Sequence, residues 1–176
     1  MNEVVIDTNV LLVADGAHDE VSPQCVTACV ERLQEATRQR VVVVDDRYRL
    51  VSEYLNKLDT KRGKGAGVVF LKWLLQNQAN RRHVHCIPVT ERQPDSFDEF
   101  PSATLEPQFD PADRKFAAVA NAHPAKPPIW QAADCKWLDW WQALADAGIR
   151  VEFLCPNDVC VFYQNKFPGR SVPALP

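Results

Sequence analysis

The stretch Val4-Val5-Ile6-Asp7-Thr8-Asn9-Val10-Leu11-Leu12 decides the fold. Its first three residues are apolar and β-branched, which predicts a short strand that is buried on both faces. Asp7 stands where this strand ends, and in open α/β sheets the carboxyl ends of the strands form the edge at which ligands bind. Asp7 therefore has two interpretations at this point, a functional carboxylate at that edge or the N-cap of a helix starting at Asn9 or Val10.

Strands and helices alternate along the chain from this point. Strands are expected at 41–44, where all four residues are β-branched, at 84–89, at 129–132, and at 149–154, where apolar and polar residues alternate. Helices are expected at 22–38, after Asp45 or Asp46 as far as Leu58, at 68–78, from Asp110 onward, and around 137–147. This alternation predicts an α/β protein with three layers, α/β/α, around a central parallel sheet of about five strands.

The length of 176 residues fits one domain. We place it at 1–156, with an insertion or long surface loop at about 91–109, where three prolines interrupt any periodicity. Residues 157–176 contain three further prolines and are expected to form a C-terminal tail, packed over the domain or partly free.

The composition indicates where the protein works. No apolar run approaches the ~20 residues that span a bilayer, and the N-terminus lacks the features of a signal peptide. We therefore expect a cytoplasmic protein that does not contact a membrane. The six cysteines include no CxxC pair, so reduced thiols in the core are expected and a zinc site is not.

The net charge of -3 hides an uneven distribution. Residues 57–85 carry a net charge of +6, whereas residues 91–113 carry -6. A run of like charge is most often a solvated surface. A basic region beside clustered carboxylates is also what a metal-dependent enzyme that acts on a polyanion requires.

Three further acids are expected near the edge where Asp7 lies. Glu53 falls beside the apolar stripe of the helix after the second strand, although a surface position is the commoner one for such a glutamate. Asp134 follows the strand at 129–132. In Phe109-Asp110-Pro111-Ala112-Asp113 we interpret Asp110 as an N-cap and assign Asp113 to the site.

With these acids in order, the sequence resembles the PIN-domain family of nucleases. The matching pieces are Val5 to Leu12, Ser52-Glu53-Tyr54, Asp113 before Lys115-Phe116-Ala117-Ala118-Val119-Ala120, and Ala133-Asp134 followed by Ala147-Gly148-Ile149-Arg150-Val151. The resemblance covers roughly residues 3 to 156 without the 91–109 segment. Ala132 and Ala133 stand where members often carry Ser, Thr or Asn, and the chain is longer than the compact toxins of toxin–antitoxin pairs.

The resemblance implies a Rossmann-like fold and a divalent-metal-dependent endoribonuclease that uses Mg2+ or Mn2+. Asp7, Glu53 and Asp113 would hold the metal, Asp134 would complete its shell or a second metal position, and Asn9 would orient Asp7. A water activated by the metal would then attack the phosphodiester bond. The implied partner is RNA, single-stranded or structured, and a homodimer or an antitoxin-like protein partner is left open.

Four bases in the basic region are expected to contact the phosphate backbone of the RNA, namely Lys57, Lys61, Arg62 and Lys64. The glycine-rich loop around them lacks the GxxxxGK[ST] pattern of a P-loop. A catalytically inactive PIN-like module that binds RNA or a protein is the main alternative function. An aspartyl phosphotransferase is disfavoured because Asn9 replaces the second Asp that it needs, and no GxGxxG supports a dinucleotide enzyme.

Overall fold

The computed structural model describes residues 2–61 and 63–176. Five strands form an all-parallel sheet in the order β3-β2-β1-β6-β7, which confirms the predicted fold class. The strands are β1 (Glu3–Ile6), β2 (Val41–Asp45), β3 (Val84–Ile87), β6 (Ile129–Gln131) and β7 (Val151–Phe153). Because β1 lies in the centre with neighbours on both sides, its three apolar residues are fully buried, as the opening motif predicts.

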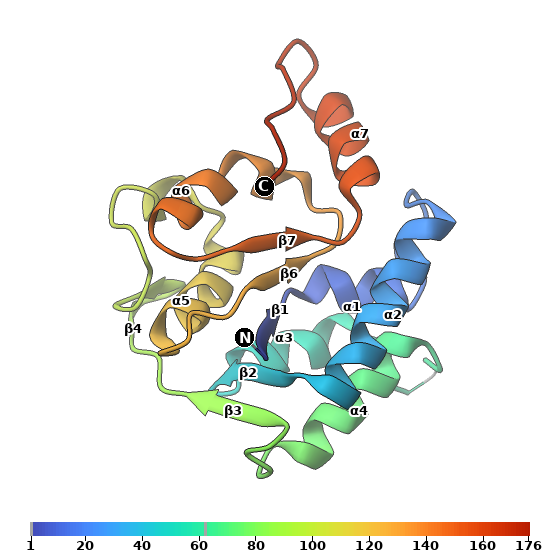
Figure 1. Ribbon diagram of the computed structural model, residues 1–176, viewed down its shortest axis with the longest axis vertical. Helices are drawn as coiled ribbons and strands as arrows, with labels where there is room; N and C mark the ends of the chain where they lie inside the picture. The colour runs from blue at the N-terminus through green and yellow to red at the C-terminus, as the bar shows by residue number, and fades with distance from the viewer. Residues whose placement is uncertain (1, 62) are drawn as a thin grey trace.

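Helices cover both faces of the sheet (Figure 1). One face carries α1 (Thr8–Ala14), α2 (Pro23–Gln39), α3 (Arg49–Lys57) and α4 (Ala66–Asn77). The other face carries α5 (Arg114–Ala122) and α6 (Trp141–Asp146), and α7 (Pro156–Lys166) packs beside the 3-10 turn η3 (Cys135–Asp139). The three-layer arrangement is therefore the one that the alternation of strands and helices predicts.

Asp45 at the end of β2 caps α3 from a distance. Its carboxylate accepts hydrogen bonds from the backbone N–H groups of Arg47, Arg49 and Leu50 at 3.0, 3.0 and 2.9 Å. The helix starts only after Tyr48, which has a positive φ of 63°. The chain therefore makes a tight turn around the buried Asp45 side chain, and the capping role expected of Asp45 or Asp46 falls to Asp45.

The glycine-rich loop before α4 is shaped around an acid. Asp15 Oδ1 accepts from the backbone N–H groups of Gly67 and Val68 at 2.6 and 3.1 Å, so it occupies the N-terminus of α4. A Cβ at Gly65 would lie 2.2 Å from the same oxygen, and a Cβ at Gly67 would lie 2.3 Å from the carbonyl oxygen of Leu11. These glycines therefore allow α1 and α4 to approach closely, and the helix N-terminus is not free for a phosphate.

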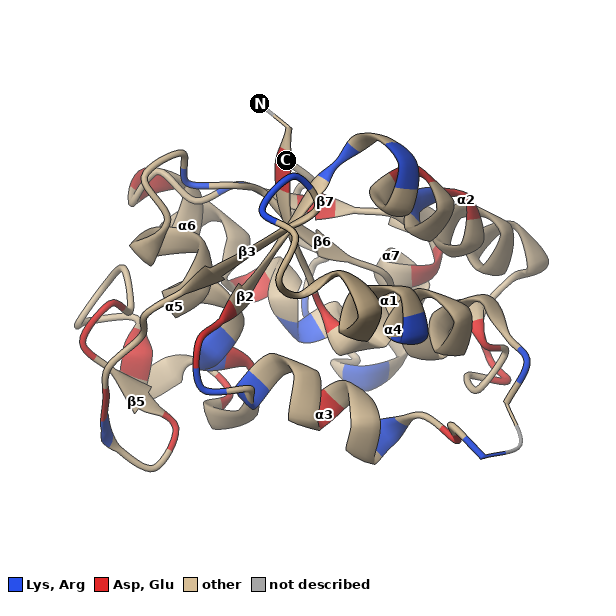
Figure 2. Cartoon of the chain, turned by 90° about the horizontal axis from the view of Figure 1, so that it is seen from below, with Lys and Arg blue, Asp and Glu red and all other residues tan. Residues whose placement is uncertain are grey.

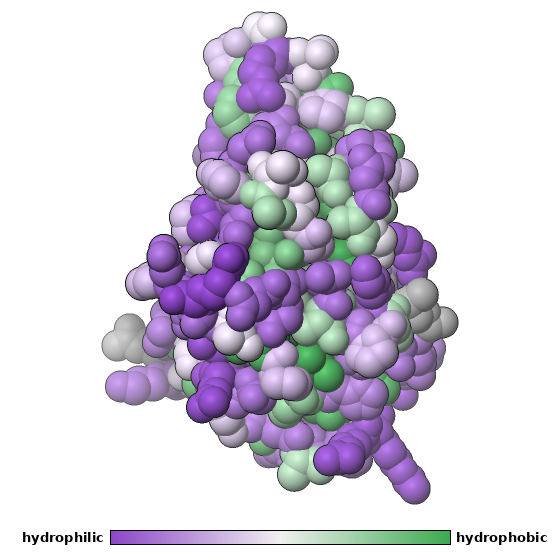
Figure 3. Space-filling view, turned by 90° about the vertical axis from the view of Figure 1, so that its left-hand side faces the viewer, coloured by the Kyte–Doolittle hydropathy of each residue, from purple (hydrophilic) through white to green (hydrophobic). Residues whose placement is uncertain are grey.

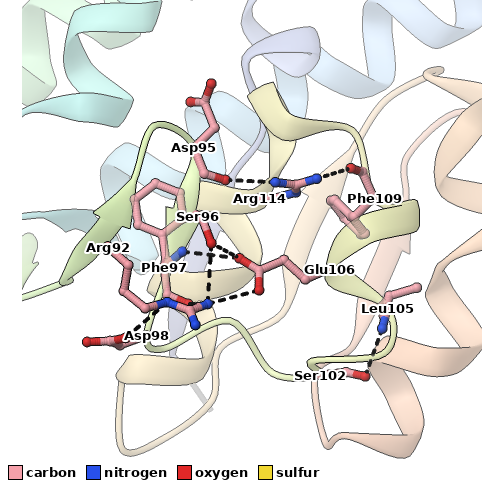
Figure 4. Close-up of polar contacts among 10 residues, drawn as sticks. All are labelled: Arg92, Asp95, Ser96, Phe97, Asp98, Ser102, Leu105, Glu106, Phe109 and Arg114. Carbon is pink, nitrogen blue, oxygen red and sulfur yellow. Dashed lines mark hydrogen bonds and ion pairs between the residues drawn. The ribbon is translucent and has the colours of Figure 1, made fainter.

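The 91–109 segment is more ordered than the expected surface loop. It contains the antiparallel hairpin β4 (Glu91–Gln93) and β5 (Ser96–Phe97) and the 3-10 turn η1 (Glu106–Gln108). Arg92 ties its two ends together by ion pairs with Asp98 and Glu106 at 3.1 and 3.0 Å (Figure 4). Four apolar side chains of the segment are buried in the core, so the expectation of a plain loop is wrong: Phe97, Phe100, Leu105 and Phe109.

Two expectations near the C-terminus also need correction. The single helix expected around 137–147 is broken at Trp140 into η3 and α6. The expected tail contains the 11-residue helix α7, whose Val159 and Tyr163 are fully buried against η3. Pro156 is the first residue of α7, a position that tolerates proline because no hydrogen bond is lost there.

The cysteines are not all reduced. Cys25 on α2 and Cys155 before α7 form a disulfide between residues 130 positions apart, which corrects the expectation of reduced thiols for these two residues. The thiol of Cys29 is buried 3.9 Å from the sulfur of Cys155. Disulfides of this kind are typical of oxidising compartments, so the cytoplasmic location stays a prediction.

Across residues 2–61 and 63–176, none of the helices combines the length and the apolar character needed to cross a bilayer. Figure 3 views the face on which the 91–109 segment lies, and hydrophilic side chains cover most of it, with small apolar patches between them.

Candidate metal centre at the carboxyl edge of the sheet

The fold brings the four predicted acids to one edge of the sheet. Asp7 follows β1, and Asp134 follows β6, the strand that pairs directly with β1. Glu53 arrives on α3, and Asp113 arrives on the 3-10 turn η2 (Pro111–Asp113) that leads into α5. Each of the other three acids is close enough to raise the pKa of Asp7 by electrostatic repulsion. Figure 2 shows acidic segments beside basic ones where α1, α3 and α5 surround the strands.

Asp7 satisfies both interpretations that its sequence position allows. Its Oδ1 accepts from the backbone N–H of Asn9 at 2.8 Å, so it is the N-cap of α1. The residue is also only 4% exposed, and a helix cap does not require such burial. Burial, together with the charges of Asp113, Asp134 and Glu53, raises the pKa of Asp7 well above its ordinary value, and the Asn9 N–H only partly offsets this.

Asp113 is the least satisfied carboxylate of the cluster. Its Oδ2 is buried and has no hydrogen-bond partner among the described residues. Burial and the nearby Asp134 raise the pKa of Asp113 to about 7, although Lys136 and Lys115 act in the opposite direction. A buried carboxylate oxygen without a donor is costly, and a bound cation would remove that cost.

Glu53 is held by two residues that the sequence analysis did not select. The hydroxyl of Thr8 donates to Glu53 Oε1 at 2.5 Å, and the buried ammonium of Lys115 forms an ion pair with Glu53 Oε2. The hydroxyl of Tyr54, the next residue on α3, donates to the carbonyl oxygen of Ile6 and fixes the helix against β1. Glu53 therefore faces the cluster and not the solvent.

Asp134 is likewise accompanied by a lysine. Lys136 Nζ forms an ion pair with Asp110 and lies 3.8 Å from Asp134 Oδ2. Although burial lowers it, these acids raise the pKa of Lys136 overall, so its ammonium is held in the charged form. Asp110 also accepts from the backbone N–H of Ala112 at 3.2 Å, as the predicted cap should, so it has two roles.

Asn9 forms a hydrogen bond with Asp7, as expected, and makes a second contact within the site. Its backbone N–H, and not its side chain, donates to Asp7. Its side-chain Oδ1 accepts from the backbone N–H of Ala133 at 2.9 Å. Asn9 therefore ties the start of α1 to the turn that carries Asp134.

An aromatic cluster links the turn that carries Asp113 to the turn that carries Asp134. Phe109 stacks on Trp140 with ring centroids 4.1 Å apart and meets the edge of Trp137 at 5.2 Å. Arg114, next to Asp113, donates to the carbonyl oxygens of Asp95 and Phe109, both at 3.2 Å (Figure 4). The 91–109 segment therefore helps to position the acidic cluster, which explains why its aromatic residues are buried.

Three of the four basic residues predicted to bind RNA are exposed on the surface, and the fourth lies outside the described residues. Lys57, Lys61 and Lys64 are exposed around the end of α3 and the following loop. Arg62 lies outside the described residues. None of the three described lysines has an ion pair with the acidic cluster, so their role with RNA stays a prediction.

The sequence analysis did not assign Thr8, Lys115 or Lys136 to the site. The local sequence only partly indicates that they belong to it. Lys115 and Lys136 each stand two residues after a predicted acid. That spacing does not show whether a lysine turns into the cluster or toward solvent. Gln131 was also missed: it is fully buried at the end of β6, and its Oε1 accepts from the backbone N–H of Asp134 at 3.4 Å.

The residues present fit a divalent cation held largely through water. In the described part of the chain, no three carboxylates of the cluster have oxygens that all lie within 4.8 Å of one another. Mg2+ in proteins commonly uses only one or two carboxylates and keeps several waters, so this spacing is compatible with it. Three cysteines, Cys25, Cys29 and Cys155, do meet the distance criterion, but two of them are joined by the disulfide.

One hollow lies away from this cluster. Its volume is about 830 Å³ and it runs along β7, where Trp141, Glu152 and Leu175 are among its lining residues. A smaller hollow of about 520 Å³ is bordered by Asn9 and Asp134 and therefore adjoins the cluster. The smaller hollow is assigned to the candidate site because residues of the site line it, whereas the lining residues of the other hollow include none of the four acids.

The fold and the site together define a class, a parallel α/β protein with a cluster of carboxylates at the carboxyl edge of its sheet. Comparison of the chain with protein-family models, with curated proteins and with solved structures finds no match. The function is therefore argued from the site alone.

Proposed function

We propose that this chain is a PIN-like endoribonuclease that depends on a divalent metal. The observation that carries the proposal is that the buried Oδ2 of Asp113 has no hydrogen-bond partner in the described part of the chain, although it lies beside the buried carboxylate of Asp7. Two carboxylates in this situation repel each other and disfavour ionisation, and a hard cation such as Mg2+ or Mn2+ relieves both effects. The order of the acids along the chain is the order of the PIN-domain resemblance.

Asp7 and Asp113 are the residues that would hold the metal. Glu53 and Asp134 already have lysine partners, so they are the better candidates for contacts through water. When bound, Mg2+ or Mn2+ supplies an activated water and stabilises the charge that develops on the scissile phosphate. The ionised carboxylates of Asp7 and Asp113 would hold the cation, and the hydrogen bond that Asp7 Oδ1 accepts from Asn9 N–H fixes the orientation of Asp7.

The two lysines keep the cluster stable without metal. Lys115 neutralises Glu53, and Lys136 neutralises Asp110 and faces Asp134. Because a lysine ammonium also binds phosphate, Lys136 is placed to exchange its acid partner for a phosphate of the bound strand. This exchange would draw the substrate toward the acids that would otherwise repel it.

Incubation of the purified protein with an internally labelled single-stranded RNA tests the proposal. Cleavage with Mn2+ or Mg2+ is expected, and it should stop with EDTA and with Asp7→Asn. The matched control is Asp146→Asn, which removes an exposed acid at the end of α6, near the start of β7 and thus toward the opposite edge of the sheet, and it should cut as the wild type does. Cleavage that survives EDTA or Asp7→Asn would overturn the metal mechanism.

A second candidate function is an inactive PIN-like module that binds RNA or a protein. The specific observation in its favour is that lysines already neutralise Glu53 and Asp110, since a site that never binds metal would need such partners. Retention of labelled RNA without cleavage, in Mn2+ as in EDTA, would favour this candidate. Mn2+-dependent cleavage that Asp7→Asn abolishes would exclude it.

A further inference from the structure

The hollow of about 520 Å³ beside the acidic cluster combines side chains of several kinds. We call it the α7 recess, and its lining includes Asn9, His18, Asp134, Phe162, Asn165 and Lys166. Three of these residues belong to α7, which the sequence analysis treated as a tail. Asn9 and Asp134 belong to the acidic cluster, so the recess and the cluster share a wall.

An aromatic pair stands in this recess. The rings of His18, from the loop after α1, and Phe162, from α7, are stacked with centroids 5.5 Å apart and an angle of 19° between their planes. Both side chains are partly exposed where they line the recess. Proteins that bind single-stranded nucleic acids stack the bases on exposed aromatic rings that lie beside basic side chains.

Cationic and amide groups complete the set. Lys166 and Asn165 are exposed on the last turns of α7, and Lys136 lines the same recess beside Asp134. Two acids, Asp134 and Glu20, also line it, so the recess is not a general site for anions. A group with one phosphate charge and a large flat ring suits this arrangement better than a free anion does.

We propose that the α7 recess binds the nucleotide of a single-stranded RNA that adjoins the bond placed at the acidic cluster. The base would stack on the His18–Phe162 pair, Lys166 would contact the backbone phosphate, and Asn165 would be within the recess to contact the base edge. The placement of the adjoining bond at the acidic cluster rests on the proposed nuclease function. RNA binding at the recess is testable without cleavage. It assigns RNA recognition to α7 rather than to the basic loop after α3.

Binding of a short single-stranded RNA that contains 2-aminopurine, measured in EDTA, tests the inference. The wild type should bind and quench the fluorescence of the stacked base. His18→Ala should weaken binding by about tenfold and abolish the quenching, since one stacking contact is lost. His18→Tyr should retain both, because it keeps an aromatic plane, and this rescue separates stacking from a general loss of structure.

A charge reversal provides the matched control. Lys166→Glu should weaken binding and lower the slope of log K against log salt by about one phosphate contact. Arg38→Glu also places an acid in the last turn of a helix, but α2 ends next to the start of β2, at the opposite edge of the sheet. It should bind as the wild type does.

The outcomes separate this inference from the proposed function. Equal affinity of the wild type, His18→Ala and Lys166→Glu would overturn the recess as the binding site, and so would absence of RNA binding by the wild type. Equal losses for Lys166→Glu and Arg38→Glu would also overturn it. If the recess variants cleave RNA with Mn2+ as the wild type does, the nuclease function is supported and the recess proposal is overturned. If RNA binding depends on the recess but no RNA is cleaved, the recess proposal is supported and the nuclease function is overturned.

Discussion

Replacing Asp113 by Asn should stabilise the metal-free protein at alkaline pH. In the folded chain the pKa of Asp113 is about 7, compared with 3.8 for an unperturbed aspartate. The folded state therefore binds the proton more tightly than the unfolded state, and stability falls as the pH rises from about 4 to about 7. Each pKa unit corresponds to about 1.4 kcal/mol, so the full shift lowers the free energy of unfolding by ~4 kcal/mol once the pH exceeds 7.

Part of that cost belongs to the neighbouring acids, because Asp134 and Asp7 share the repulsion. We therefore expect Asp113→Asn to gain about 2 to 4 kcal/mol at pH 8 and close to nothing at pH 4. Urea unfolding in EDTA at several pH values measures the difference. Mn2+ should reverse the ranking, since the wild type gains stability by binding it and the variant loses a ligand.

Asp110 is the matched control in the same turn. Its contact with Lys136 lowers its pKa, so Asp110→Asn should reduce stability at pH 8, the opposite sign. An Asp113→Asn variant that is less stable than the wild type at pH 8 in EDTA would refute the account of an unsatisfied carboxylate. Stabilisation of equal size at pH 4 and pH 8 would refute its electrostatic origin.

Three further predictions concern the supports of the site. Lys115→Met should cost about 2 kcal/mol because it leaves the charge of Glu53 unpaired, and Glu53→Gln in the same chain should recover most of the loss in urea unfolding. Breaking the Cys25–Cys155 bond by Cys25→Ser should lower the free energy of unfolding by about 3 kcal/mol, and a reductant should then have little further effect on stability. Gly67→Ala should cost about 3 kcal/mol, because a Cβ would lie 2.3 Å from the carbonyl oxygen of Leu11, whereas Gly16→Ala, with φ of +69° and open space around it, should cost roughly 1 kcal/mol in thermal unfolding.

Strands β1 and β2 could be predicted from the sequence because each contains a short run of apolar, β-branched residues that is buried. The same information was not present at 91–109. Burial there depends on single aromatic residues such as Phe97 and Phe109, which follow no period, and Phe109 packs against the distant Trp137 and Trp140. The prolines of this segment predict a loop where the structure has a hairpin.

The candidate site shows the same division. A carboxylate after a buried strand has a fixed place in a parallel sheet, so the edge position of Asp7 and Asp134 follows from topology. The partners of these acids depend on the direction of side chains. The sequence around Lys115 does not show whether its ammonium points into the cluster or toward solvent. The disulfide joins Cys25 to a residue 130 positions away, a pairing that no spacing predicts.

Titration of the protein with Mn2+ by isothermal calorimetry tests the central claim most directly, that the carboxylates around Asp7 and Asp113 form a metal site. We expect binding that strengthens as the pH rises through about 7, releases protons at lower pH, and is lost in both Asp7→Asn and Asp113→Asn. Absence of Mn2+ binding at pH 8, or binding that both substitutions leave unchanged, would contradict the account.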